Sequence, residues 1–381
     1  MAETVERAGR SLSWSGQAVD VDRIEEELFK LRYLAAGRTD GGYAVRTSLA
    51  NMIVHAADDE TAAYASRVIE ELARHHPSRA QIIIANPSPE VSHIEASLAA
   101  HCHVDSGSDQ SVCCEEVTLR VSGKAAHHLQ SVIEPLLIPD LPVTVWWTGD
   151  FPDDTRLIEE LCDLADHFII DSSRFQDQIG DLVRARSLAD IHDSEVGDLN
   201  FERLRPWRDI FDRYVESGGL REWLPAVAGI EIHYADVWGM QTSGQAALML
   251  GWLAGRLGLD MTNVTRRGAQ HMILGRDGRD VPAFVAPVGY DAVNRGWLVS
   301  IKVAFEGAEG DSAVFSMSRT ADPLHVTILT QMPGCSREDH VRIEATDNPT
   351  ILTRQLDAAP HDPEFKQLLA ACTPLLEASR S

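Results

Sequence analysis

The stretch that decides the fold is LIPDLPVTVWWTGDFP, residues 137 to 152. Its centre, VTVWW, is apolar apart from one threonine, and a Thr-Gly-Asp step follows at once. A short apolar run without alternation, bounded by Pro and Gly, is typical of a parallel strand covered on both faces. Trp146 and Trp147 are neighbours on this strand, so their side chains point to opposite faces. We expect one indole to lie in the core and the other to shape a surface near the strand end.

Three further runs of the same kind surround this strand: SLANMIVHA (48–56), AQIIIANPSP (80–89) and HFIIDSS (167–173). Amphipathic segments separate them, for example DDETAAYASRVIEELARHH (58–76), in which Ala62, Ala65, Ile69 and Leu72 share one face. Buried strands that alternate with amphipathic helices predict βαβ units and a Rossmann-like, mostly parallel sheet. Residues 91–121 contain two strand-like segments around the turn-rich DSGSDQ, which predicts an antiparallel hairpin at one edge.

The two ends of the chain have different patterns. Residues 1–20 are polar and are expected to be loose, and an amphipathic helix is predicted over 21–36. After about residue 263 the apolar period becomes two, which predicts a mainly antiparallel β region that ends in helical segments. We therefore expect an N-terminal tail and helix over 1–45, a Rossmann-like α/β domain over 46–262, and an antiparallel β domain with a helical tail over 263–381.

One predicted helix is unusually rich in glycine. The segment TSGQAALMLGWLAGRLG, residues 242–258, is apolar along most of its length. Gly251, Gly255 and Gly258 lie in it, and such residues suit close packing against a neighbouring element.

The composition limits the classes of partner. The chain has 381 residues and a formal net charge of -24. Nucleic acids and anionic membrane surfaces attract basic proteins, so neither is expected as a partner. The sequence has no apolar run near the ~20 residues of a membrane span and no apolar signal core near its start, so we expect a cytoplasmic protein. Six scattered cysteines then indicate thiols in a reducing compartment.

The common cofactor and catalytic motifs are missing from the sequence. There is no GxGxxG, no GxxxxGK[ST], no GxSxG and no HExxH. The turns AADDE (56–60) and TGDFPDD (148–154) carry acidic residues where a dinucleotide fold places glycines and a bare helix N-terminus. We therefore expect no cofactor, no metal and no complete catalytic set.

Some residues allow a chemical as well as a structural interpretation. Asp150 and Asp171 follow two parallel strands and could hold Mg²⁺ or act as acid and base, or they could simply cap the next helices. Trp207 lies among arginines in RPWRD, which is either a solvated helix face or a contact surface for an acidic partner. Cys113 and Cys114 could form a thiol switch or could be buried thiols.

Five segments in series resemble the glucose-6-phosphate dehydrogenase assembly protein OpcA family. They are CCEEVTLRVSG (113–123), PLLIPDLPVTVWWTGDFP (135–152), FIIDSSRF (168–175), DLNFERLRPWRDIF (198–211) and LMLGWLAGRLG (248–258). The resemblance runs from about residue 49 to 330. It implies a non-enzymatic protein that binds the dehydrogenase, promotes its assembly or active conformation, and raises flux into the oxidative pentose phosphate pathway. It also implies thioredoxin as a second partner, although the adjacent Cys113 and Cys114 match no redox pair of the family.

The segments chosen as the contact surface are the exit of the VTVWW strand, the DSSRF turn and the RPWRD helix. Their residue types led to this hypothesis, since aromatic and arginine side chains are frequent anchors of interfaces. The partner-binding residues are therefore expected to be Trp146, Trp147, Asp150, Asp171, Arg174, Arg205, Trp207 and Arg208. Two alternatives stay open at this point, namely a Mg²⁺-dependent sugar-phosphate enzyme and a thiol redox sensor.

Overall fold

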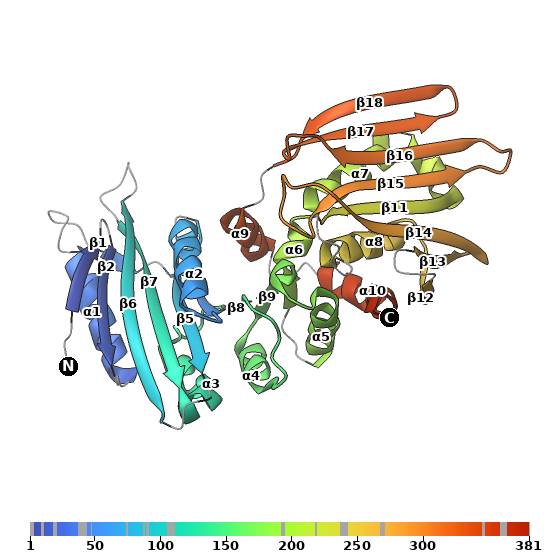
Figure 1. Cartoon of the computed structure of the whole chain (residues 1–381). Helices are drawn as coiled ribbons and strands as arrows, with labels where there is room; N and C mark the ends of the chain where they lie inside the picture. Colours follow the sequence, from blue (N-terminus) through green and yellow to red (C-terminus); the bar gives the residue numbers. More distant parts are fainter. Residues whose placement is uncertain are drawn as a thin grey trace. The chain divides into compact units, whose positions relative to one another are not determined.

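The computed structural model divides the chain into two compact units (Figure 1). Unit 1 comprises Met1–Arg174, Leu188–Gly197 and Asp347–Asp362, and unit 2 comprises Phe175–Ser187, Asp198–Thr346 and Pro363–Ser381. The structure describes residues 4–8, 11–17, 21–36, 44–46, 48–73, 75–86, 88, 91–104, 111–191, 195–217, 219–236, 243–266, 271–344, 347–358 and 364–380. No helix within these ranges is long and apolar enough to cross a membrane.

The first sheet is the Rossmann-like sheet that the sequence predicts. Its strand order is β1-β2-β6-β7-β5-β4-β8-β9-β10, and β3 pairs with β7. The pairs β7–β5, β5–β4, β4–β8 and β8–β9 are all parallel, whereas β6 and β7 form the expected antiparallel hairpin. The strands are β1 (Thr4–Ala8), β2 (Ser11–Gln17), β3 (Ala44–Arg46), β4 (Ala50–His55), β5 (Ser78–Asn86), β6 (His93–Val104), β7 (Ser111–Ser122), β8 (Val143–Trp147), β9 (His167–Ile170) and β10 (Glu195–Asp198).

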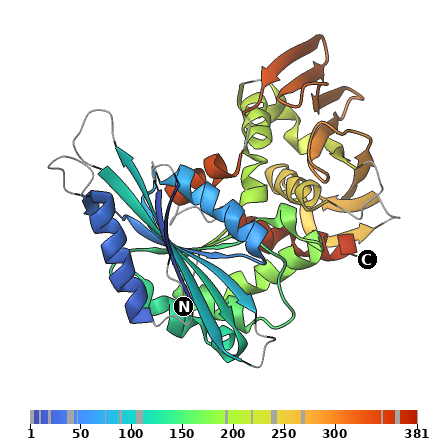
Figure 2. The same cartoon turned by 60° about the vertical axis from the view of Figure 1, so that its left-hand side comes forward.

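Helices cover both faces of this sheet. Figure 2 shows α1 on one face and α2 on the other. The four residues predicted to face inward from α2 are all buried. The helices of unit 1, with 3-10 helices marked η, are α1 (Val21–Ala36), α2 (Asp59–Leu72), η1 (Gly123–His127), α3 (Leu129–Ile133), η2 (Glu134–Leu136), α4 (Arg156–Leu164), η3 (Ser172–Arg174) and α9 (Asn348–Ala358).

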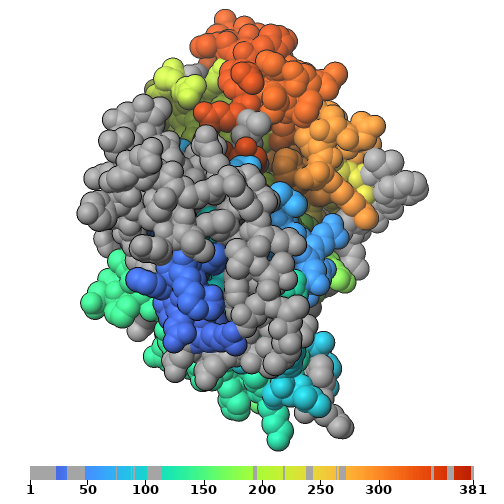
Figure 3. Space-filling view, turned by 90° about the vertical axis from the view of Figure 1, so that its left-hand side faces the viewer, coloured from blue at the N-terminus to red at the C-terminus, as the bar shows by residue number. Residues whose placement is uncertain are grey.

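The N-terminal segment differs from the loose tail expected from its composition. Strands β1 and β2 pair with each other, and β2 pairs with β6, so they extend the antiparallel edge of the sheet. Edge strands need backbone partners more than apolar side chains, and this explains why a polar sequence can form them. The helix α1 is confirmed, with Ile24, Leu28 and Leu31 buried. Phe29, on its other side, is exposed, and the described part of α1 reaches the surface (Figure 3).

The second sheet is mainly antiparallel, as the sequence predicts, but it begins earlier in the chain. Its order is β12-β13-β14-β11-β15-β16-β17-β18. The strand β11 pairs in parallel with β14 and antiparallel with β15, so it belongs here and not to the predicted domain over 46–262. The strands are β11 (Val227–Ala235), β12 (Asp260–Arg266), β13 (His271–Arg276), β14 (Arg279–Val288), β15 (Leu298–Glu306), β16 (Ser312–Arg319), β17 (His325–Met332) and β18 (Cys335–Arg342).

One face of the second sheet packs against helices, which lie behind the strands in Figure 1. Phe211 of α7 meets Phe315 of β16 edge to face at 5.3 Å between ring centroids, and it meets Trp252 of α8 at 5.8 Å. The remaining helices are α5 (Gln178–Ile191), α6 (Leu199–Glu202), α7 (Arg205–Ser217), η4 (Leu220–Ala226), α8 (Gly244–Arg256) and α10 (Glu364–Arg380).

The glycines of the 242–258 segment have separate roles. A Cβ on Gly251 would lie 2.8 Å from the Cβ of Cys372 in α10, so this glycine allows the two helices to approach closely. A Cβ on Gly255 would meet nothing within 4 Å. Gly258 has φ of +66° and follows the end of α8, where a left-handed residue ends the helix.

These glycines yield a matched pair of substitutions. Gly251→Ala should lower the free energy of unfolding by about 1–3 kcal/mol, because the added methyl overpacks the contact between α8 and α10. Gly255→Ala should raise it by up to about 1 kcal/mol, because alanine favours an exposed helical position. Urea denaturation of both variants checks this difference. Equal effects of the same sign would contradict the assignment of the close contact to Gly251.

Candidate functional site

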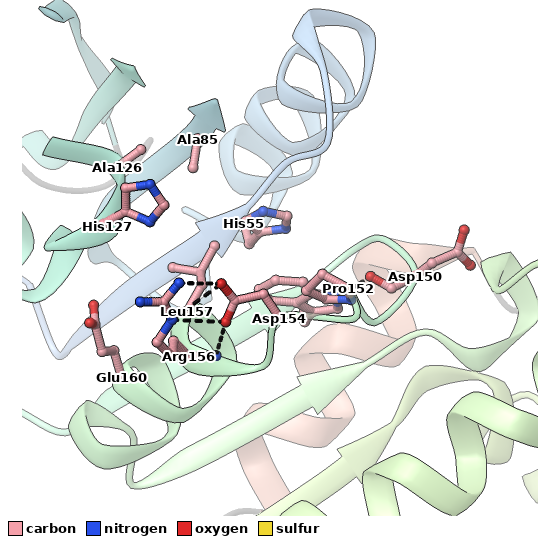
Figure 4. Close-up of a pocket in the computed structure, with 11 residues that line it drawn as sticks. His55, Ala85, Ala126, His127, Asp150, Pro152, Asp154, Arg156, Leu157 and Glu160 are labelled. Carbon is pink, nitrogen blue, oxygen red and sulfur yellow. Dashed lines mark hydrogen bonds and ion pairs between the residues drawn. The ribbon is translucent and has the colours of Figure 1, made fainter. Parts of the chain in front are cut away.

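A pocket lies at the carboxyl edge of the parallel sheet in unit 1 (Figure 4). The strand order reverses there, because β5 lies on one side of β4 and β8 on the other. Open α/β sheets bind ligands at such a point. The cavity volume is about 220 Å³, and the wall includes residues from η1 and α4. The lining residues are His55, Ala85, Ala126, His127, Trp147, Asp150, Pro152, Asp154, Arg156, Leu157 and Glu160.

Two stacked rings form the inner part of this pocket. His55, the last residue of β4, lies on Trp147 of β8 with ring centroids 3.7 Å apart and planes only 3° from parallel. The two residues are paired across neighbouring parallel strands, which places their side chains on the same face. Trp147 is 1% exposed and donates its indole N–H to the Asp150 carbonyl at 3.3 Å. Burial lowers the pKa of His55 to about 4, so its ring is neutral at neutral pH.

Trp146 lies on the opposite face of β8 and is fully buried. Its ring packs edge-on against Tyr64 of α2, with 6.2 Å between centroids. Its indole nitrogen has no hydrogen-bond partner among the described residues. The expectation that one tryptophan is exposed is therefore wrong. Both faces of β8 are covered, so a residue on either face lies in the core.

The N-terminus of α2, where a dinucleotide fold would bind phosphate, is already occupied by carboxylates. Asp58 caps the helix and accepts a hydrogen bond from the Thr61 backbone N–H at 2.8 Å. That bond lowers the pKa of Asp58. Asp59 and Glu60 add two further acids in the first turn. A phosphate would meet negative charge here instead of free N–H groups, so this turn does not suit a nucleotide phosphate.

The rim of the pocket carries charged side chains of both signs. Asp154 and Arg156 form an exposed ion pair, with 2.9 Å between Nε and Oδ1 (Figure 4). This pair holds the pKa of Asp154 near 2. Glu160 is half-buried on the same helix, and its charge adds to that of Asp154 in raising the pKa of Arg156. Asp150 also borders the pocket, but Figure 4 shows its carboxylate pointing away from the other lining side chains.

Asp171 and Arg174 lie elsewhere in unit 1. Asp171 is 1% exposed and accepts hydrogen bonds from the backbone N–H and the hydroxyl of Ser173, the latter at 2.6 Å. It therefore holds the turn after β9 and does not line the pocket that contains Asp150. The exposed Arg174 lies over the Tyr64 ring, 5.3 Å from its centroid. No group of three His, Cys, Asp or Glu side chains that could hold a metal occurs in the described part of the chain.

The RPWRD segment begins α7 in unit 2, and most of it is buried. Trp207 is 1% exposed, with the Arg319 guanidinium 5.3 Å from its ring centroid. Arg208 is 5% exposed and pairs with Glu364 at 2.6 Å. Burial removes Trp207 and Arg208 from the surface, so neither can make the direct contact suggested by the sequence. Arg205, paired with Glu202 at 2.8 Å, is the partly exposed member of the cluster.

The two cysteines proposed as a thiol switch differ in what the structure describes. Cys114 is buried, and its sulfur accepts a hydrogen bond from the Ser78 backbone N–H at 3.4 Å. Burial raises its pKa to about 11, which makes the thiolate scarce and the thiol unreactive. The side chain of Cys113 lies outside the described residues. Its backbone is paired with that of Cys102 in the β6–β7 hairpin.

Sequence reasoning named Trp147 and Asp150 but missed the other nine lining residues of the pocket. His55 could have been noticed as the polar end of an apolar run, where a parallel strand reaches its ligand-binding edge. Arg156 and Glu160 are four residues apart, which puts them on one face of α4. The only sequence signal that α4 would border a site was its position directly after the VTVWW strand.

The neutral state of His55 predicts a pH effect on stability. The unfolded residue ionises near its usual pKa of 6.5 and the folded one near 4, so the unfolded chain binds more protons between these values. Stability from His55 is therefore present above pH ~6.5 and is lost as the pH falls toward 4. His55→Phe keeps a ring on Trp147 and should reduce the loss of unfolding free energy between pH 7 and 5 by up to about 2 kcal/mol. Denaturant titrations at both pH values check this, and an unchanged loss would contradict it.

Comparisons with known proteins match the chain over most of its length. Residues 69–187 match the family described as "Glucose-6-phosphate dehydrogenase subunit N-terminal domain". Residues 194–369 match the corresponding C-terminal domain family. The chain is also similar to solved structures of a levoglucosan dehydrogenase and of an aldose-aldose oxidoreductase from Caulobacter crescentus. For these the sequence identity is 9% and 11%, the TM-score 0.46 and 0.47, and 88% of this chain aligns with 97% and 98% of theirs.

Two curated relatives carry the name "Putative OxPP cycle protein OpcA". The protein of Synechococcus elongatus is 26% identical over 73% of this chain, and that of Nostoc punctiforme is 27% identical over 67%. The chain spans 63% and 55% of the length of these relatives. The two family matches divide the chain near residue 190, and together with these relatives they show that the chain belongs to the OpcA family of glucose-6-phosphate dehydrogenase assembly proteins.

Proposed function

We propose that this chain binds glucose-6-phosphate dehydrogenase, without catalysing a reaction itself, and promotes the active oligomer of that enzyme. The observation that carries the proposal is the acid-capped turn before α2. A sheet that has lost its phosphate site at the switch point supports a scaffold for contacts more than a dehydrogenase. Family membership supports the dehydrogenase as the partner, and the names of the relatives support a role in the oxidative pentose phosphate pathway.

The activation would follow from linked equilibria. A binding protein shifts its partner toward the active oligomer only by the difference between its affinities for the active and inactive forms. This chain therefore needs a surface that fits the active form better. Five of the predicted contact residues are buried, so they would support such a surface from within without touching the partner. They are Trp146, Trp147, Asp171, Trp207 and Arg208. Asp150, Arg174 and Arg205 remain candidates for contact.

The two rival functions have less support. A Mg²⁺-dependent sugar-phosphate enzyme would need Asp150 and Asp171 in one cleft, whereas Asp171 is buried in a turn and does not line the pocket of Asp150. A thiol sensor would need a reactive thiolate, and Cys114 has a raised pKa. A thioredoxin partner and a cytoplasmic location stay predictions from the sequence and its resemblance.

The decisive measurement uses the dehydrogenase of the same organism. Mixed with this chain, it should elute from a sizing column as a larger assembly, and its kcat/KM should rise by at least about fivefold, the lower range of typical allosteric coupling. No co-elution together with unchanged kinetics would exclude the proposed function.

A second measurement tests the contact residues. Charge reversal at the exposed Arg174 should weaken the assembly, whereas Arg67→Glu, on the exposed side of α2, is the matched control. Trp147→Ala is unsuitable here, because removing a buried tryptophan costs about 3–5 kcal/mol and would impair the fold. Equal affinities of the Arg174 and Arg67 variants would remove Arg174 from the contact surface.

A further inference from the structure

The sheet of unit 2 packs its helices on one face, behind the strands in Figure 1, and leaves side chains of the other face half-exposed. Ile232, Val303 and Phe315 point to the covered face and are fully buried. Successive residues of a strand point to opposite faces, so their neighbours in sequence form the other face. We refer to this side as the open face. The pairing register aligns one central row across it: Phe284, Glu231, Lys302, Ser316 and Leu329.

The open face carries no net charge in its centre. Glu231 and Lys302 form an ion pair with 2.9 Å between Oε1 and Nζ, and these side chains are 44% and 43% exposed. The rows beside them on β11, β15 and β16 contain no Asp, Glu, Lys or Arg among their described residues. They hold His233, Ser300 and Ser318 on one side, and Gly229, Ala304 and Val314 on the other. The whole chain has a net charge of -24 and would repel a copy of itself, whereas this face would not.

The ion pair lies on the midline of the sheet. The strand order places four strands on each side of the boundary between β11 and β15. Glu231 and Lys302 are directly opposite each other across this boundary. A two-fold axis along the boundary, between two stacked copies, would place Glu231 of each copy over Lys302 of the other. The face is therefore complementary to itself, as a two-fold contact between identical surfaces requires.

The sizes of the side chains also match across this axis. It brings β11 of one copy over β15 of the second, and β14 over β16. Sheets that stack about 10 Å apart need a small side chain opposite each large one, so that the two layers interdigitate. The facing pairs would be Phe284 with Ser316, His233 with Ser300, and Gly229 with Ala304.

The area of the open face is sufficient for a stable contact. The five strands β14, β11, β15, β16 and β17 have eight to ten residues each. At the usual strand spacing they present roughly 600 Å² in projection, and the accessible area of an uneven surface is larger. A specific interface buries about 800 Å² of accessible surface on each partner.

We propose that two copies of this chain associate through the open face, with a two-fold axis along the boundary between β11 and β15. Glu231 of each copy then pairs with Lys302 of the other, and the two ion pairs join into a ring of four alternating charges. The strands of the two sheets are roughly aligned, as in a β-sandwich. The contact is made by unit 2 alone and does not depend on the proposed function.

A pair of charge reversals tests the position of the axis. The full chain, measured by light scattering on a sizing column, should have twice the mass of one chain. Glu231→Lys and Lys302→Glu each place like charges opposite one another twice in the dimer, and each should raise the dimer dissociation constant at least about tenfold. An equimolar mixture of the two variants should restore the dimer to within about threefold of the parent, because unlike charges then meet across the axis. Lys366→Glu makes the same change of charge on α10 and should leave the dimer intact.

The mixture also guards against misfolding, since two variants that recover a dimer together are both folded. Failure of the mixture to recover it, while each variant alone is monomeric and keeps the circular dichroism spectrum of the parent, would overturn the proposed axis. A parent chain that stays monomeric at about 100 µM, or a dimer that both reversals leave unchanged, would overturn the proposal as a whole.

A bulky substitution tests the packing of the two layers. Ser316→Arg places a long charged side chain where Phe284 of the second copy would lie, and it should dissociate the dimer. Ser217→Arg, at an exposed position of α7, is the control and should not. If the chain is monomeric and the open-face variants instead weaken its complex with the dehydrogenase, that enzyme occupies the face and a second copy is excluded. A dimer with these properties that forms no such complex supports the proposal, while the proposed function fails separately.

Discussion

Burial of the VTVWW strand on both faces is the constraint on which the rest of unit 1 depends. The strand β8 lies between β4 and β9 with parallel pairing on both sides, and each of its residues is buried. Its two large indoles therefore face opposite layers. Trp146 fixes α2 on one face through Tyr64, and Trp147 fixes the end of β4 on the other through His55. The chain leaves β8 at the carboxyl edge of the sheet. The pocket lies there because the stacked rings of His55 and Trp147 form its inner wall.

The same edge shows how a sheet of this kind can lose its phosphate site without losing its architecture. In a nucleotide-binding fold, glycines let the backbone approach the phosphate and the helix N-terminus stays bare. Here Asp58 satisfies that N-terminus and His55 covers the ring of Trp147. Both changes are local and stabilise the chain without a bound ligand. The carboxylates in the first turn of α2 also make this end of the helix unsuitable for an anion.

The sequence predicted the order and type of the elements better than their surroundings. Apolar runs separated by amphipathic helices are a local signal, so the parallel sheet and the inward face of α2 were predicted correctly. Whether a tryptophan is exposed depends on which other elements cover the strand end, and the local sequence pattern carries no information about them. Gly251 and Gly255 are four residues apart in one helix, yet only Gly251 meets α10, because that contact comes from a segment more than 100 residues away. The strand β11 was likewise placed in the wrong domain, because its partners β14 and β15 follow it in sequence.

A protein that acts by binding must leave part of its surface energetically unsatisfied until the partner arrives. Most charged groups at the strand exits of this chain are already paired or capped: Asp58 by Thr61, Asp154 by Arg156, Asp171 by Ser173. Such groups gain little from a partner, because a new contact would first break an existing one. Glu160 borders a cavity, and its charge interacts with that of Arg156, which also pairs with Asp154. Differential affinity, which any assembly factor requires, therefore has to come from contacts that form only with the active form of the partner.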